Sequence, residues 1–204
     1  MWFRSIRKLM NIVKEKNNNF VSRAEGKLAG AVRAFSFDFK NKIVMDIGSS
    51  TGGFTELALN LGAKKVFAIE KGTNQMKKPL RFDSRIDLRE KTDVFDLKRQ
   101  NFFEPIDVFL ADVSFVSLKK ILNHVGRNLV KKQAEFLVML KPQFEAKDFQ
   151  LNRGVVKNEK IRREIIKDFE FWLKENGFLI LGKHDNELTG KNGNRERFYY
   201  LKKC

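Results

Sequence analysis

The chain has 204 residues, with 41 Lys and Arg against 25 Asp and Glu, and a formal net charge of +16. This length suits one domain with a hydrophobic core, and a hydrophobic content of 42% argues against a disordered chain. The basic excess favours a polyanionic partner such as nucleic acid, or an anionic membrane surface, although an AT-rich genome that enriches Lys is an alternative explanation.

Several classes of site and location are disfavoured. The single cysteine, Cys204, excludes an intramolecular disulfide and a Cys-based metal site, and His124 and His184 lack metal-ligand spacing, so we expect no metal. No stretch is long enough to span a membrane, and the first ten residues lack the apolar core of a signal peptide. We therefore expect a cytoplasmic protein without stable membrane association.

In chain order, residues 2–16 carry apolar residues at helical spacing with basic residues between them, which predicts a short basic amphipathic helix; a frayed terminus is the alternative. We divide the chain into this N-terminal helix and linker, residues 1–20, and one domain, residues 21–204. Helix patterns follow near 23–35, 53–61, 116–131 and 158–176, and apolar strand patterns at 43–47, 65–69, 107–111, 135–140, 178–182 and 197–201, with a further strand in RIDLREKTD (85–93).

This alternation predicts an α/β fold with a parallel sheet that is covered on both faces. The last two strand patterns are separated by the polar stretch HDNELTGKNGNRE, which has no helical periodicity, so we expect them to form a hairpin. A doubly wound sheet that ends in an antiparallel hairpin is typical of many S-adenosylmethionine (SAM) methyltransferases.

The stretch MDIGSSTGGFTE (45–56) has the pattern of a strand that leads into a ligand-binding loop and a helix. A phosphate-binding Walker A loop is excluded because Phe54 stands where the motif requires Lys. A dinucleotide-binding loop is disfavoured, though not excluded, because Ser50 stands at the second glycine position.

SAM fits this loop better, because its sulfonium is cationic and it carries no phosphate. Asp46 suits a cationic ligand, and three glycines, Gly48, Gly52 and Gly53, would let the methionine portion lie against the backbone. Glu70 ends the next strand, where a carboxylate can accept both ribose hydroxyls of an adenosine. A glycine-rich turn with an acidic helix cap is the alternative.

Asp93 follows the third strand, at a position that overlooks the adenine in such a sheet. Its carboxylate could accept the exocyclic amine, or it could be a solvated turn residue. The expected cofactor-binding residues are Asp46, Gly48, Ser49, Ser50, Thr51, Gly52, Gly53, Phe54, Glu70, Lys71, Asp93, Val94 and Asp112.

Charged residues close two further strands of the predicted sheet. Asp112 follows one apolar run and Lys141 follows the next, with Pro142 ending the strand immediately afterwards. Because ligands in an open α/β sheet bind at the carboxyl ends of strands, we expect Asp112 and Lys141 to share one rim. An ordinary structural ion pair would give the same pattern.

Six segments, in this order and spacing, resemble the TlyA family, often called haemolysin A: SRAEGKL (22–28), MDIGSSTGGFTE, ADVSFVSL (111–118), LKPQFE (140–145), RGVV (153–156) and GNRERF (193–198). The resemblance covers about residues 20–203. It implies an FtsJ-type ribose 2′-O-methyltransferase that acts on ribosomal RNA or ribosomal subunits with SAM as cofactor. The implied fold is the Rossmann-like class I methyltransferase fold, with a mostly parallel seven-stranded sheet and a C-terminal antiparallel hairpin.

The resemblance also implies a catalytic tetrad of Lys27, Asp112, Lys141 and Glu196. Lys141 would orient the ribose hydroxyl and either take its proton or stabilise the oxyanion, and Asp112 would hold Lys141 and face the SAM methyl group. Lys27 and Glu196 would complete the cluster around the ribose.

Two departures from the family pattern bear on the substrate. Ala24 and Glu25 replace two glycines of the family's first motif. The family usually carries an S4-type RNA-binding domain, and too few residues precede SRAEGKL to form one. We therefore expect either a trimmed sequence or another route to the RNA.

The RNA is expected to lie across the same rim, and a solvated basic surface is the alternative. Phe144 could stack on a flipped base or belong to the core. Two other functions remain open: a basic RNA- or ribosome-binding module with weak or no turnover, and a membrane-active haemolysin. Monomer and homodimer are both open. The expected RNA-contacting residues are Arg23, Ser114, Phe115, Phe144 and Arg153, within a wider basic rim of Arg33, Lys71, Lys77, Lys78, Arg81, Lys147 and Lys157.

Overall fold

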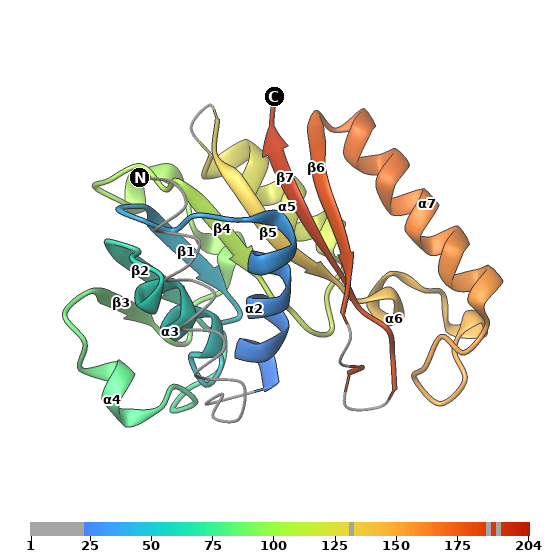
Figure 1. Ribbon diagram of the computed structural model, residues 1–204, viewed down its shortest axis with the longest axis horizontal. Coiled ribbons are helices and arrows are strands. Elements are labelled where there is room, and N and C mark those ends of the chain that lie inside the picture. Colours follow the sequence, from blue (N-terminus) through green and yellow to red (C-terminus); the bar gives the residue numbers. More distant parts are fainter. Residues whose placement is uncertain (1–22, 131–132, 187–188, 191–192) are drawn as a thin grey trace.

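The computed structural model describes residues 23–130, 133–186, 189–190 and 193–204 (Figure 1). The helix expected within residues 2–16 lies outside these ranges. The strands are β1 (Ile43–Ile47), β2 (Lys65–Ile69), β3 (Ile86–Arg89), β4 (Val108–Ala111), β5 (Glu135–Leu140), β6 (Phe178–Asp185) and β7 (Arg197–Lys203). The α-helices are α2 (Arg23–Phe35), α3 (Gly53–Asn60), α4 (Lys78–Arg81), α5 (Leu118–Asn128), α6 (Pro142–Glu145) and α7 (Glu159–Glu175).

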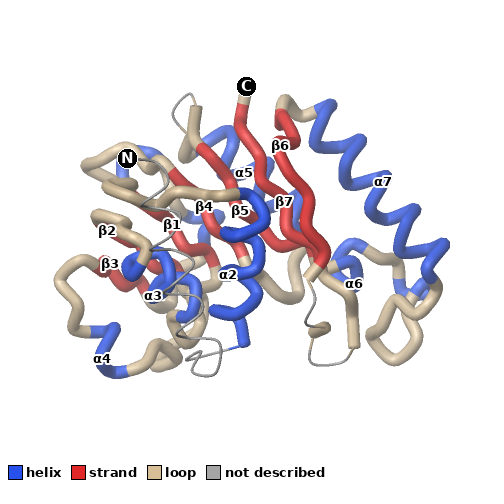
Figure 2. The backbone as a smooth tube through the Cα atoms, in the orientation of Figure 1, coloured by secondary structure: helices blue, strands red, loops and turns tan. Residues whose placement is uncertain are grey.

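Within the described residues the strands form one seven-stranded sheet in the order β3-β2-β1-β4-β5-β7-β6. Strands β1 to β5 pair in parallel, and β7 pairs antiparallel with both β5 and β6. The predicted mostly parallel sheet with a C-terminal antiparallel hairpin is confirmed, and Figure 2 shows the hairpin at one side of the sheet. The four longer predicted helices are also present, with ends that differ from the expected ones by at most a few residues.

The sheet is covered on both faces, as the uninterrupted apolar runs predicted (Figure 1). On one face, α2 and α3 pack on the sheet through a core that includes Leu28, Val32 and Leu57. On the other face, α5 and α7 pack through a second core that includes Ile121 and Phe169. All five residues of β1 are buried because the strand lies between these two layers.

The strand register determines where a site can form. Ile47 at the end of β1 pairs with Ile69 of β2 and with Ala111 of β4, so these strands end level with one another. Because β1 to β5 are parallel, the loops that follow them meet at one edge of the sheet, where open α/β sheets bind ligands. Strand β7 runs the other way and therefore begins at this same edge.

Among the described residues, no helix is long and apolar enough to cross a membrane.

Candidate active site

The loop after β1 is shaped by left-handed backbone conformations. Gly48, Ser50 and Gly52 have φ angles of 81°, 47° and 91°, a region that glycine adopts without steric cost. A Cβ atom on Gly48 would lie 3.1 Å from the carbonyl oxygen of Asp112. Glycine at this position therefore lets the loop approach the segment that follows β4.

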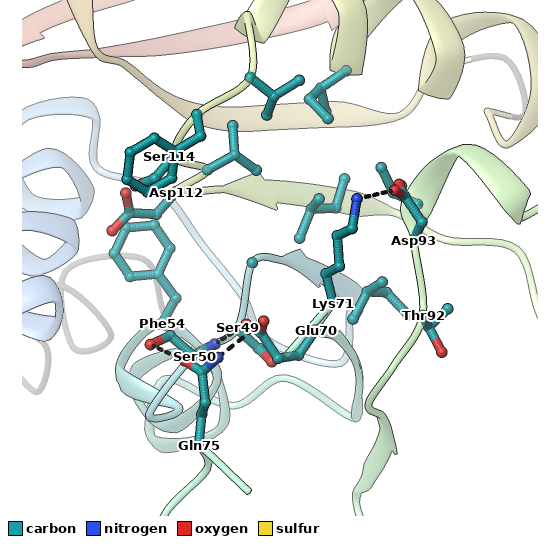
Figure 3. A pocket seen from close by; sticks show the side chains of 18 of the residues that line it. Ser49, Ser50, Phe54, Glu70, Lys71, Gln75, Thr92, Asp93, Asp112 and Ser114 are labelled. Atoms are coloured by element: carbon teal, nitrogen blue, oxygen red, sulfur yellow. Dashed lines mark hydrogen bonds and ion pairs between the residues drawn. The ribbon is translucent and has the colours of Figure 1, made fainter. Parts of the chain in front are cut away.

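A cavity of about 710 Å³ opens at the carboxyl edge of the sheet (Figure 3). Its lining comes mainly from the ends of β1 and β2, from the segments that follow β1 to β5, and from single residues of α2 and α5. Cavities of this size are typical of cofactor sites. The lining includes these expected residues: Gly48, Ser49, Ser50, Thr51, Gly53, Phe54, Glu70, Lys71, Asp93, Val94, Asp112, Ser114, Phe115 and Lys141.

The Glu70 carboxylate is held in place by the loop residues around it. Its Oε2 accepts a hydrogen bond from the backbone N–H of Ser50 at 2.9 Å, and its Oε1 accepts one from the N–H of Gly72 at 2.7 Å. Gln75 Nε2 donates a third hydrogen bond, to Oε1, at 3.3 Å. These donors orient Glu70 at the cavity wall, and Gln75 is a cavity residue that the sequence pattern did not indicate.

Lys71 and Asp93 form an ion pair of 2.9 Å across the cavity lining, between the ends of β2 and β3 (Figure 3). Asp93 also accepts a hydrogen bond at 3.1 Å from the N–H of Phe95, so it caps the short 3-10 helix Val94–Asp96. The hydrogen bond from Lys71 lowers the pKa of Asp93. The carboxylate therefore stays ionised at neutral pH, as an acceptor for an amine requires.

Asp46 and Gly52 lie outside the cavity lining, in contrast to the other expected loop residues. Asp46 is fully buried in β1, and its Oδ2 accepts a hydrogen bond from Thr55 Oγ1 of α3 at 2.7 Å. Burial raises the pKa of Asp46 to about 7, against the smaller opposing effect of the Thr55 hydrogen bond. Asp46 thus joins β1 to α3 beneath the loop rather than facing the cavity.

Lys141 and Asp112 meet at the cavity, as their positions after neighbouring strands predicted. Lys141 Nζ lies 2.6 Å from Asp112 Oδ1 and donates a hydrogen bond to Ser114 Oγ at 3.0 Å. Their side chains are only 12% and 18% exposed, so water screens this ion pair weakly.

Lys27 and Glu196 form a second ion pair, between α2 and the residue before β7. The β5–β7 register pairs Leu140 with Arg197, and its continuation places Glu196 opposite Lys141. Neither Lys27 nor Glu196 lines the cavity, although Ala24, three residues before Lys27 on α2, does. Glu25, the other departure from the family motif, is fully buried.

Side-chain contacts connect the segment after β4, residues 112–118, with the segment after β5, residues 141–145. The rings of Phe115 and Phe144 lie 5.3 Å apart, and Phe115 is 94% exposed with a φ angle of 63°. Glu145 accepts hydrogen bonds from Ser117 Oγ at 2.6 Å and from the N–H of Leu118 at 2.5 Å, at the start of α5. No role was predicted for Glu145, because its hydrogen-bond partners lie in a separate segment of the chain.

The remaining expected RNA residues are more dispersed. Phe144 is half-buried and Arg153 is exposed, and neither lines the cavity; Arg23 begins α2. Among the described residues, no group of three or more His, Cys, Asp and Glu could hold a metal ion.

The cavity residues fit SAM. Glu70 and Asp93 supply carboxylates at the ends of β2 and β3, where an adenosine needs acceptors for its hydroxyls and amine. Ser49 Oγ is buried in the lining without a hydrogen-bond partner among the described residues, so it is available to a ligand. Asp112 supplies a negative charge near the loop, which suits a sulfonium.

A model of FtsJ-like methyltransferases matches residues 20–203, which is almost the whole chain. The chain belongs to the FtsJ-like methyltransferase family. It is a SAM-dependent RNA methyltransferase with the class I fold, as the resemblance implied.

Curated relatives of this methyltransferase carry two kinds of name. The 23S rRNA (cytidine-2′-O)-methyltransferase TlyA of Campylobacter jejuni is 38% identical over 183 residues, which is 89% of this chain and 70% of the relative. Hemolysin A of Brachyspira hyodysenteriae is 36% identical over 189 residues, which is 91% of this chain and 78% of the relative.

Solved structures support the same fold. A Lactococcus lactis protein superposes with a TM-score of 0.87 at 33% identity, covering 92% of this chain and 90% of that one. Methanococcus jannaschii fibrillarin superposes with a TM-score of 0.67 at 21% identity, covering 89% of this methyltransferase and 75% of fibrillarin, which supports the fold alone.

Proposed function

We propose that this methyltransferase transfers a methyl group from SAM to a ribose 2′-hydroxyl of ribosomal RNA, with Lys27, Asp112, Lys141 and Glu196 as the catalytic residues. The observation that carries the proposal is the Lys141–Asp112 ion pair of 2.6 Å in the cavity lining. SAM, when bound, supplies an electrophilic methyl group on a positively charged sulfur.

Lys141 positions the ribose oxygen. Its ammonium donates to Ser114 and lies against Asp112, which leaves a third N–H for the 2′-oxygen of the substrate. This N–H holds the oxygen in line for displacement and stabilises the negative charge that develops on it. As the oxygen–methyl bond forms and the methyl–sulfur bond breaks, the hydroxyl proton passes to solvent at the open cavity. Of the two roles considered for Lys141, the contacts favour electrostatic stabilisation.

Asp112 fixes the Lys141 side chain, and its negative charge faces the cavity near the glycine-rich loop. Lys27 and Glu196 pair with each other, and their proposed place in the cluster is supported by the β5–β7 register, whose continuation sets Glu196 opposite Lys141. Their ion pair supplies a donor and an acceptor for the remaining ribose hydroxyl.

Two aromatic rings support a proposed contact with the target base. Phe115 is exposed at the cavity and lies against Phe144, so a nucleotide turned out of its stack can pack on Phe115 while its ribose reaches Lys141. Ser114, Arg153 and Arg23 are the further proposed RNA contacts.

The nature of the RNA is supported by the relatives. The Campylobacter jejuni protein and a Mycobacterium tuberculosis protein, 32% identical over 194 residues, are both named rRNA (cytidine-2′-O)-methyltransferases. We therefore propose a ribosomal cytidine as the target of this chain, and the net charge of +16 agrees with an RNA substrate.

The decisive experiment incubates the protein with labelled SAM and with ribosomal subunits or naked ribosomal RNA, and then maps any 2′-O-methyl group. Lys141→Ala should lower transfer by at least about 100-fold while SAM affinity, measured by calorimetry, changes little. Lys167→Ala, which removes an exposed lysine of α7, is the matched control.

Near-normal turnover by Lys141→Ala would contradict its proposed role. If the wild-type protein binds ribosomal RNA but transfers no methyl group to subunits or naked RNA, the RNA-binding module is the better description.

A further inference from the structure

Cationic side chains alternate with aromatic rings in the segment that begins at Lys141 and continues to Phe149. Lys141 Nζ lies 5.9 Å from the centre of the Phe144 ring, and Lys147 Nζ lies 6.0 Å from the centre of the Phe149 ring. Phe149 is 81% exposed, so neither the core nor a neighbouring element covers it. Cations interleaved with exposed rings are the usual composition of surfaces that bind single-stranded nucleic acid.

Residues 146–157, here called the rim arm, are held in a defined conformation. Asn152 and Val155 exchange backbone hydrogen bonds of 2.9 and 3.1 Å, which closes a tight turn. Arg153 and Gly154 in this turn have φ angles of 49° and 76°, and the Arg153 side chain is exposed. The turn therefore directs a cationic side chain into solvent.

The rim arm is tied to the catalytic end of the sheet by one buried amide. Asn194 Nδ2 donates to the carbonyl of Gly154 at 3.1 Å, and Asn194 Oδ1 accepts from the N–H of Val156 at 3.1 Å. Asn194 lies two residues before Glu196 and three residues before the start of β7. The rim arm thus has a fixed position relative to the proposed catalytic cluster.

The rim arm is also positively charged. It carries Lys147, Arg153 and Lys157 against a single acid, Asp148, which gives a net charge of +2. All four side chains are exposed, and the three basic ones form no ion pair with the described residues. The charge is therefore available to a phosphate backbone.

We propose that the rim arm binds unpaired RNA next to the methylated nucleotide, with a neighbouring base stacked on Phe149 and the backbone phosphates near Lys147 and Arg153. The proposal rests on the proposed function for the identity of the polymer. It adds the substrate class: a base can stack on Phe149 only when it has left a helix, so the RNA around the target is a loop or a single strand rather than a continuous duplex.

The test measures the affinity of the full chain for a labelled short single-stranded RNA and for the same strand in a duplex. Phe149→Ala should weaken binding of the single strand about tenfold and binding of the duplex less than about twofold, because stacking on an aromatic ring requires an exposed base face. Phe149→Tyr should retain the wild-type affinity. Phe171→Ala, which removes a ring that is 65% exposed on α7, is the matched control and should have no effect.

The proposed phosphate contacts of Lys147 and Arg153 are tested separately, by the salt dependence of RNA affinity. Arg153→Ala and Lys147→Ala should each reduce the slope of log affinity against log salt concentration by about one, with SAM affinity unchanged. An unchanged slope in both variants would remove the phosphate contacts from the proposal.

The base-stacking proposal is overturned if Phe149→Ala binds the single strand with an affinity within twofold of wild type. It is also overturned if Phe149→Ala weakens binding of the duplex as much as binding of the single strand, or if Phe171→Ala weakens single-strand binding as much as Phe149→Ala does. These results are separable from the proposed function. If methyl transfer occurs and does not depend on Phe149, only the proposed role of the rim arm is refuted. If RNA binding depends on Phe149 but no methyl group is transferred, only the proposed function is refuted.

Discussion

Replacement of Asp46 by Asn should make the protein more stable at neutral pH. Asp46 is fully buried and accepts a hydrogen bond from the Thr55 hydroxyl, and burial raises its pKa from 3.8 to about 7. Between these values the unfolded chain carries an ionised Asp46 and the folded chain a neutral one, so stability decreases as pH rises. Above pH 7 the cost reaches about 4 kcal/mol, since each tenfold change in the proton equilibrium corresponds to about 1.4 kcal/mol.

Asparagine has nearly the same shape, keeps an oxygen for the Thr55 hydroxyl and carries no charge. The difference in free energy of unfolding between Asp46→Asn and wild type should therefore grow by about 3 kcal/mol from pH 5 to pH 8. Urea denaturation of both proteins at several pH values in this range gives this quantity directly.

Glu164→Gln, at an exposed position of α7, controls for the loss of one negative charge from a basic chain. A difference between Asp46→Asn and wild type that is constant from pH 5 to pH 8, or that shrinks as pH rises, would refute the reasoning. In that case the buried carboxylate must be ionised in the native protein and stabilised by groups that the described contacts do not include.

Two further substitutions test the supports of the site. Glu70→Ala should weaken SAM binding about tenfold by calorimetry, because it removes the carboxylate at the end of β2 that Ser50 and Gly72 orient; unchanged affinity would exclude Glu70 from the cofactor site. Glu145→Ala should lower the free energy of unfolding by about 1–2 kcal/mol, because it removes the acceptor for the N–H of Leu118 at the start of α5. It should also lower methyl transfer with little change in SAM affinity, and Glu145→Gln should restore part of both losses; equal losses in the two variants would argue against a hydrogen-bonding role.

Much of the fold could be read from local sequence. Strands β1 and β5 lie between two helical layers, so both of their faces are apolar and the runs IVMDI and EFLVML are visible without any structure. The hairpin was predictable because the polar residues between β6 and β7 contain no helical pattern. The short helices α4 and α6 escaped prediction, since four residues are too few to show a periodicity.

The site residues that could be predicted are those that directly follow a parallel strand. Asp112 and Lys141 each follow a parallel strand, and parallel neighbours end at the same edge, so sequence alone placed them together. Asp46 shows the limit of this reasoning. Its residue type suggested contact with a cation, but the alternation of side chains along β1 directs it to Thr55 beneath the loop.

Local periodicity and the residues that end strands were enough to predict the succession of strands and helices along the chain, the glycine-rich loop, and the rim that carries Asp112 and Lys141. Contacts between side chains of distant segments became visible only in the folded protein, such as Glu145 with the start of α5 and Asn194 with the rim arm. Such contacts depend on how distant segments pack, and the spacing of residues along the chain does not reveal which of these side chains lie close together in space.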